Sequence, residues 1–146
     1  MERSKKIIVV DASVVAKWFI DEEYTGEALK MREDYKNGVV DLWSTQLMPF
    51  EVLNALRYNP EFSQKEVEKA ANALSRYRIA LYPLLNDLRE PCVRIALKYG
   101  ITIYDASYVA LGQILNKELY TADEKLLAKI GKDEEEVVHH IREYPA

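Results

Sequence analysis

Short apolar segments of strand length alternate along this chain with longer segments of helical periodicity. The strand-like segments are residues 7–10, 39–43, 79–82, 118–121 and 137–141. Helices are predicted after the first of them and over residues 25–37, 49–58, 63–77, 87–99, 105–116 and 123–130. Because parallel strands need a crossover connection, usually a helix, this order predicts an α/β fold. The expected form is a three-layer α/β/α arrangement with a mostly parallel sheet.

Length and composition indicate a single domain over residues 1–146. Hydrophobic residues make up 49% of the 146 residues, enough for a sizeable core, and no linker-like segment interrupts the pattern. The first residues lack the apolar segment of a signal peptide, and no segment approaches the ~20 apolar residues of a membrane span. A cytoplasmic protein is therefore expected. Cys92 is the only cysteine, which excludes an internal disulfide and a cysteine cluster for zinc.

The net charge of −4 argues against a protein that coats nucleic acid through bulk positive potential. Any contact with nucleic acid must therefore be local. Basic residues on the predicted helices are interpreted as solvated surface, with Lys17 as a candidate for a phosphate contact. The ten tyrosines are interpreted as side chains of the core or its rim.

Four acidic residues stand where predicted strands end or predicted helices begin. Asp11 directly follows the first strand, and Asp123 comes just after the fourth. Glu51 follows Pro49 in the first turn of a helix, and Asp105 begins another predicted helix. The carboxyl ends of parallel strands meet at one edge of the sheet, where open α/β sheets bind ligands. The four acids are therefore expected to lie near one another.

Each acid also has an ordinary structural explanation. Asp11 and Asp105 could serve as helix N-caps, and Glu51 could stabilise the positive end of a helix dipole. A capping-box pattern that starts at Thr121 accounts for the acid after the fourth strand. These explanations treat the acids singly, and they do not explain why all four stand at the same edge.

Taken as a group, the four carboxylates indicate a hard cation. Crowded carboxylates raise one another's pKa unless a divalent cation lies among them. Mg²⁺ takes one or two carboxylates directly and keeps several waters, and Mn²⁺ is usually tolerated in the same place. Such an ion supports phosphodiester hydrolysis, because it activates water and neutralises charge on the phosphate.

Four segments, VVDASVV, EVLNAL, YDASYVAL and LYTAD, resemble in order and spacing the acidic motifs of PIN-domain ribonucleases. The resemblance is strongest to the VapC-type toxins of toxin–antitoxin pairs and covers nearly the whole chain, although residues 58–88 match only in being helical. It implies a PIN-like fold and a metal-dependent endoribonuclease that leaves a 5′-phosphate and a 3′-hydroxyl. It also implies a homodimer and a small antitoxin whose tail enters the acidic cleft.

The resemblance implies roles for individual residues. The implied catalytic residues are Asp11, Glu51, Asp105 and Asp123. Of these, Asp11 and Asp105 would bind the metal directly, and the other two would act through water. Ser13 and Thr121 would support the acids through hydrogen bonds. Asn54 matches a position that is often polar in the family.

Two other functions remain open from the sequence. The first is a non-catalytic PIN-like module that binds RNA or protein. The second is a Mg²⁺ pocket for phosphotransfer, as in receiver-type domains, although Asp11 is followed by Ala12 and Ser13 rather than by a second acid. His139 and His140 are neighbours on a predicted strand and face opposite sides, so they cannot share one metal.

Overall fold

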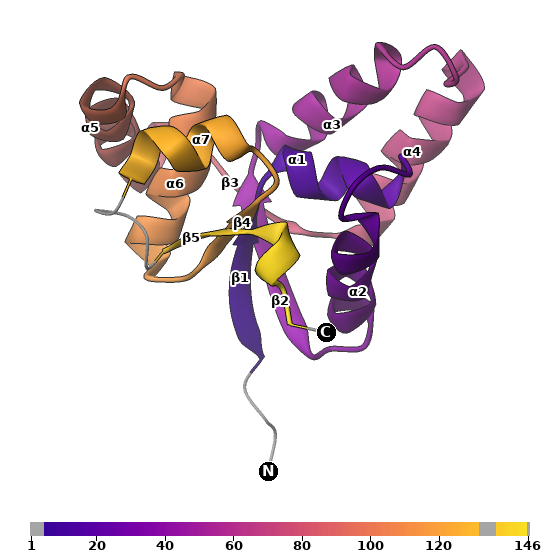
Figure 1. The fold of residues 1–146 in the computed structure, drawn as a ribbon, viewed down its shortest axis with the longest axis horizontal. Helices are drawn as coiled ribbons and strands as arrows, with labels where there is room; N and C mark the ends of the chain where they lie inside the picture. The colour runs from indigo at the N-terminus through magenta and orange to yellow at the C-terminus, as the bar shows by residue number, and fades with distance from the viewer. Residues whose placement is uncertain (1–4, 132–136, 146) are drawn as a thin grey trace.

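In residues 5–131 and 137–145, which the computed structural model describes, the chain forms a sheet of five parallel strands in the order β3-β2-β1-β4-β5 (Figure 1). The strands are β1 (Lys6–Val10), β2 (Val40–Thr45), β3 (Ala80–Tyr82), β4 (Leu119–Thr121) and β5 (Val138–His140). Each lies within two residues of its predicted bounds. The prediction of a mostly parallel sheet is confirmed.

Helices cover both faces of the sheet. They are α1 (Ala12–Val15), α2 (Thr25–Lys36), α3 (Met48–Arg57), α4 (Gln64–Tyr77), α5 (Arg89–Tyr99), α6 (Ile103–Leu115) and α7 (Glu124–Ile130). Short helical turns lie at η1 (Ala16–Trp18), η2 (Leu84–Leu88) and η4 (Ile141–Glu143). Helices α1–α4 lie on one side and α5–α7 on the other, which confirms the three-layer fold (Figure 1). Within the described residues, no helix is both long enough and apolar enough to cross a membrane.

The start of α6 differs from its prediction. The helix begins at Ile103 because Thr102 is its N-cap, with Oγ1 accepting a hydrogen bond from the backbone N–H of Asp105 at 3.0 Å. Asp105 is therefore the third residue of the helix and not its cap. The predicted start of α5 at residue 87 is also early, because residues 84–88 form the separate turn η2.

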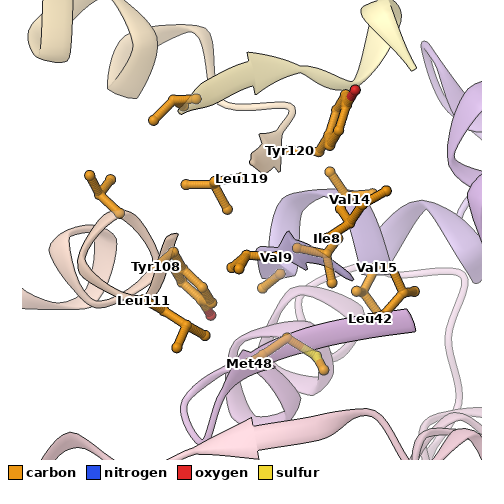
Figure 2. Close-up of a cluster of buried hydrophobic side chains, with 14 of the residues drawn as sticks. Ile8, Val9, Val14, Val15, Leu42, Met48, Tyr108, Leu111, Leu119 and Tyr120 are labelled. Carbon is orange, nitrogen blue, oxygen red and sulfur yellow. The ribbon is translucent and has the colours of Figure 1, made fainter. Parts of the chain in front are cut away.

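The hydrophobic core lies on both sides of β1. Ile8, Val9 and Val10 are at most 1% exposed, as expected for a parallel strand covered on both faces. Figure 2 shows the side chains of β1 between those of α1 and those of α6. Close packing of α6 is provided by small side chains, including Ala106 and Ala110, which are fully buried.

The order of the strands creates a switch point beside β1. Strand β1 pairs with β2 on one edge, where Ile8 is opposite Leu42, and with β4 on the other, where Val9 is opposite Leu119. Strands β2 and β3 continue in one direction across the sheet, and β4 and β5 in the other. Open parallel sheets bind ligands at such a point, outside the carboxyl ends of the strands.

Candidate active site

Asp11 lies directly after β1, at the switch point, and caps α1. Its Oδ1 accepts a hydrogen bond from the backbone N–H of Val14 at 3.3 Å, as expected for an N-cap. The same oxygen accepts from the Ser13 hydroxyl at 2.6 Å, and Oδ2 accepts from the Thr121 hydroxyl at 2.5 Å. The side chain is buried. Both carboxylate oxygens are therefore held in place, which capping alone does not require.

The environment of Asp11 opposes its negative charge. Burial raises the pKa of Asp11 from 3.8 to about 6, although the hydrogen bonds from Ser13 and Thr121 lower it, and the charge of Asp123 raises it further. Among the described residues, no lysine or arginine forms an ion pair with Asp11. A bound cation would offset the cost of burying this carboxylate. The surroundings of Asp11 therefore suit a metal ligand.

Hydrogen bonds join the start of α1 to the end of β4 and to the loop that follows it. The backbone N–H of Ala122 donates to Oγ of Ser13 at 2.8 Å, and that of Asp123 donates to Oγ1 of Thr121 at 3.0 Å. The two hydroxyl oxygens are 3.3 Å apart. Ser13 and Thr121 thus hold the carboxylate of Asp11 and, through the backbone, also fix the start of the next acidic segment.

Asp123 is the N-cap of α7. Its Oδ1 accepts hydrogen bonds from the backbone N–H groups of the second and third helical residues, at 3.0 and 3.1 Å. The predicted capping box from Thr121 is wrong, because Thr121 lies in β4 and its hydroxyl donates to Asp11. The charge of Asp123 raises the pKa of both Asp11 and Asp105, so it is the acid that couples these two.

Asp105 and Glu51 stand in the first turns of α6 and α3. Burial raises the pKa of Asp105, and the charge of Asp123 adds to the effect. Burial also raises the pKa of Glu51, the Tyr108 hydroxyl lowers it, and the charge of Asp105 raises it. The hydroxyl of Tyr108 donates to Oε1 of Glu51 at 2.5 Å.

Sequence reasoning missed Tyr108. Tyr108 is 2% exposed, as expected for a tyrosine of the core, but its hydroxyl reaches the carboxylate of Glu51. One signal was present in the sequence. Tyr108 follows Asp105 by three residues, and residues at that spacing share a face of a helix.

The charges of the acids act on one another in pairs. The charge of Asp123 raises the pKa of Asp11 and of Asp105, and the charge of Asp105 raises the pKa of Glu51. Among the described residues, no three His, Cys, Asp or Glu side chains are arranged as a metal-binding group. A cage of several protein ligands is therefore not formed by that part of the chain. Mg²⁺ needs no such cage, because it binds through one or two carboxylates and keeps its remaining waters. The donor set fits a hydrated hard cation.

Residues 8–133 match the family model of the PIN domain. The chain belongs to the PIN-domain family. All four acids lie inside the matched segment, and the predicted membership of this family is confirmed. Over 126 residues this PIN domain is 29% identical to Ribonuclease VapC3 from Pyrobaculum aerophilum, a match that covers 84% of this chain and 93% of that protein.

Solved structures have the same fold. The crystal structure of PAE2754 from Pyrobaculum aerophilum matches with a TM-score of 0.63 and 23% identity, over 95% of this chain and 93% of that one. A toxin-antitoxin complex from Klebsiella pneumoniae contains a chain that matches with a TM-score of 0.66 and 18% identity, over 92% of this chain and 97% of that one. At these identities the likeness concerns the fold alone.

Two other candidate residues from the sequence, Asn54 and Lys17, make no hydrogen bond to the four acids in the part of the chain that the structure describes. Asn54 is exposed on α3 and lines a groove of about 480 Å³ beside α4, without a hydrogen bond to any of the acids among the described residues. Lys17 is buried, and its Nζ donates to Oε1 of Glu22 at 3.0 Å and to the backbone oxygen of Glu23 at 2.7 Å. It is therefore not the solvated side chain expected, and its charge is already paired.

The two histidines differ in burial, as expected for neighbours on a strand. His140 is buried, and its Nδ1 accepts a hydrogen bond from the backbone N–H of Arg142 at 3.0 Å. His139 is partly exposed, and its ring lies against that of Tyr120, with centroids 5.5 Å apart. Neither belongs to the acidic group.

Proposed function

We propose that this PIN domain is a divalent-metal-dependent endoribonuclease, the VapC-type toxin of a toxin–antitoxin pair, with Mg²⁺ as its ion and Mn²⁺ as a substitute. The observation that carries the proposal is the state of Asp11. This carboxylate is buried, both its oxygens are held by hydroxyl groups, and it forms no ion pair with a lysine or arginine of the described residues. The relationship to Ribonuclease VapC3 supports the assignment to RNA.

The residues of the site divide the work between them. Asp11 and Asp105 would hold the ion directly, with Ser13 and Thr121 fixing the orientation of Asp11. The other two acids, Glu51 and Asp123, would accept hydrogen bonds from water in the cleft and orient it toward the phosphorus. When bound, the ion would supply Lewis acidity that activates water and neutralises charge on the phosphate.

The charge of the site explains why the substrate needs the ion. Four coupled carboxylates repel a phosphodiester, so RNA would not enter an unneutralised cleft. In-line attack by water on the phosphorus would form a new P–O bond and break the P–O3′ bond, and with O3′ taking up a proton the products would be a 5′-phosphate and a 3′-hydroxyl. A cytoplasmic location accompanies this proposal, because its RNA substrate is there.

Cleavage of a labelled single-stranded RNA tests the proposal. Purified protein is incubated with the RNA in Mg²⁺, in Mn²⁺ and in EDTA, beside the Asp105→Asn variant. A matched control is Glu90→Gln, which changes an exposed acid in the first turn of a different helix, α5. Metal-dependent fragments with 5′-phosphates are expected from the wild type and from Glu90→Gln but not from Asp105→Asn.

Metal binding and labelling by a phosphodonor, measured on the same proteins, separate the alternative functions. The wild type could bind metal, and Asp105→Asn could lose it, while no RNA in a diverse pool is cleaved. That result would favour the non-catalytic binding module over the nuclease. Stable labelling of an aspartate by a small phosphodonor would favour the phosphotransfer pocket. Absence of metal binding in the wild type would return the four acids to structural roles.

A small antitoxin is proposed as partner. The acidic cleft is complementary to an arginine or lysine side chain from a partner, which would compete with the ion and the substrate. The Klebsiella pneumoniae structure with this fold is a toxin-antitoxin complex, which supports such a pairing. A cognate basic peptide should bind the wild type more tightly than Asp11→Asn. Equal binding would place the peptide outside the acidic cleft.

A homodimer is also proposed. A mostly apolar hollow of about 290 Å³ is lined by four exposed side chains: Phe50, Leu84, Ile103 and Tyr104. Exposed apolar groups that gather in this way mark interaction surfaces. Light scattering should show a dimer for the wild type and a monomer for Leu84→Glu. The control Leu97→Glu, at an exposed position outside the hollow, should remain dimeric.

A further inference from the structure

Tyr108 combines a buried ring with a hydroxyl that reaches the acidic site. The ring belongs to α6 and packs in the core beside β1, as Figure 2 shows. Its hydroxyl donates a hydrogen bond to Oε1 of Glu51 on α3, at 2.5 Å and across 57 residues of sequence. The side chain is 2% exposed, so water does not compete freely for this bond.

The core alone does not account for the hydroxyl. Phenylalanine would fill the same space without introducing a buried polar atom, which must find a partner. The Thr45 side chain, at the carboxyl end of β2, lowers the pKa of Tyr108, as a hydroxyl that donates toward the phenol oxygen does. When Thr45 donates to this oxygen, the phenol proton is directed to Glu51. Residues from β2 and α6 thus fix one oxygen of a carboxylate on α3.

Glu51 needs such a restraint more than Asp11 and Asp123 do. Asp11 is held by two hydroxyls, and Asp123 is held by two backbone N–H groups of α7. Glu51 has one more rotatable bond than aspartate, and its only hydrogen bond to another side chain among the described residues is the one from Tyr108. Without that bond, the carboxylate would sample several rotamers.

We infer that Tyr108 is a positioning residue of the active site, which holds Oε1 of Glu51 so that the carboxylate stays oriented toward the ion and its waters. The inference rests on the proposed function for its catalytic consequence. The geometry of the hydrogen bond stands independently of it. Tyr108 would not contact RNA or the metal ion and would act through Glu51 alone.

The test compares two tyrosine-to-phenylalanine variants. Tyr108→Phe removes the hydroxyl at the site. Tyr144→Phe is the matched control, because Tyr144 is also buried and also donates to a carboxylate, Oδ2 of Asp34, at 2.5 Å but in another part of the fold. Mn²⁺ affinity is measured by electron paramagnetic resonance, and kcat and KM are measured on the same RNA.

Tyr108→Phe is expected to weaken Mn²⁺ binding about tenfold and to lower kcat about tenfold, with KM for RNA little changed, because hydrogen-bonded groups around a metal site that do not touch the ion contribute on this scale. Tyr144→Phe is expected to change neither quantity, although its thermal stability should fall. Equal metal affinity and equal kcat in Tyr108→Phe and the wild type would overturn the positioning role.

A double-mutant cycle identifies the route of the effect. Mn²⁺ affinity is also measured for Glu51→Gln and for Glu51→Gln with Tyr108→Phe. If Tyr108 acts through Glu51, the second substitution should add nothing in the Glu51→Gln background. An undiminished tenfold loss there would overturn the inference, because it would mean that Tyr108 acts on the fold of the site as a whole.

The metal-binding measurements separate this inference from the proposed function. If the wild type bound Mn²⁺ but cleaved no RNA, the proposed nuclease would fail, and the cycle would still test whether Tyr108 orients Glu51. If the wild type cleaved RNA and the cycle showed no coupling, the nuclease would stand and the positioning role would be rejected.

Discussion

Thr121 donates a hydrogen bond to Oδ2 of Asp11 at 2.5 Å, although the two residues are 110 positions apart. The bond links the ends of β4 and β1, the two strands that flank the switch point of the sheet. The same hydroxyl oxygen accepts the backbone N–H of Asp123 at 3.0 Å. One side chain therefore sets the spacing between two acids that come from different loops.

Replacing Thr121 with valine should damage the site more than the fold. Valine keeps the β-branched shape, but it removes the donor to Asp11 and the acceptor for the Asp123 backbone. We expect Mn²⁺ affinity to fall about tenfold and the free energy of unfolding to fall by about 1–2 kcal/mol. Calorimetric titration and urea unfolding measure the two effects. Thr121→Ser keeps the hydroxyl and should resemble the wild type; equal losses in both variants would assign the effect to packing.

Asp11 should destabilise the metal-free protein at neutral pH. Its folded pKa of about 6 lies above the ordinary value of 3.8, so deprotonation costs more in the folded state than in the unfolded chain. In EDTA at pH 8, Asp11→Asn should therefore unfold at a higher urea concentration, with a gain of about 1–2 kcal/mol after allowing for its altered hydrogen bonds. The gain should shrink as the pH falls from 6 to 4. A loss of stability at pH 8 would show that the site tolerates the charge without a cation.

Asp34 provides the opposite case. Burial alone would raise the pKa of Asp34, but hydrogen bonds from Lys30 and Tyr144 outweigh it and lower the pKa below 3.8. A lowered folded pKa contributes stability that is present above the unfolded value and is lost as the pH falls through the folded value. Asp34→Asn should thus destabilise the protein at pH 7 by about 1–2 kcal/mol, and urea unfolding at pH 3 should show a smaller difference. An Asn variant as stable as the wild type at pH 7 would contradict this assignment.

The sequence predicts the sheet better than the contacts within the site. Buried parallel strands appear as short apolar runs, so all five strands could be located. The expectation that the acids stand at one edge of the sheet came from the rule that ligands bind at the carboxyl ends of parallel strands. The start of α6 could not be placed, because Thr102 and Asp105 are both good capping residues and only the structure shows which one caps.

Side-chain direction explains the contacts that the sequence did not predict. The bond between Tyr108 and Glu51 depends on how α6 and α3 are rotated relative to the sheet, and no pattern within either helix encodes that rotation. For the same reason, Asn54, although only three residues after Glu51, lies in the exposed groove toward α4. Periodicity identifies the buried face of a helix but not the partner that a particular side chain meets.

Metal affinity should depend on pH through Asp11. A proton competes with the cation for this carboxylate, so Mn²⁺ affinity should fall as the pH decreases through about 6, by up to about tenfold per pH unit. Ser13→Ala removes a hydrogen bond that lowers the pKa of Asp11, so its midpoint should move to higher pH. Ser44→Ala is the matched control, because the buried Ser44 hydroxyl donates to the backbone oxygen of Val10 at 2.5 Å and not to a carboxylate. Electron paramagnetic resonance of Mn²⁺ between pH 5 and pH 8 gives the three midpoints, and a shift shared by both variants would exclude a specific effect of Ser13 on Asp11.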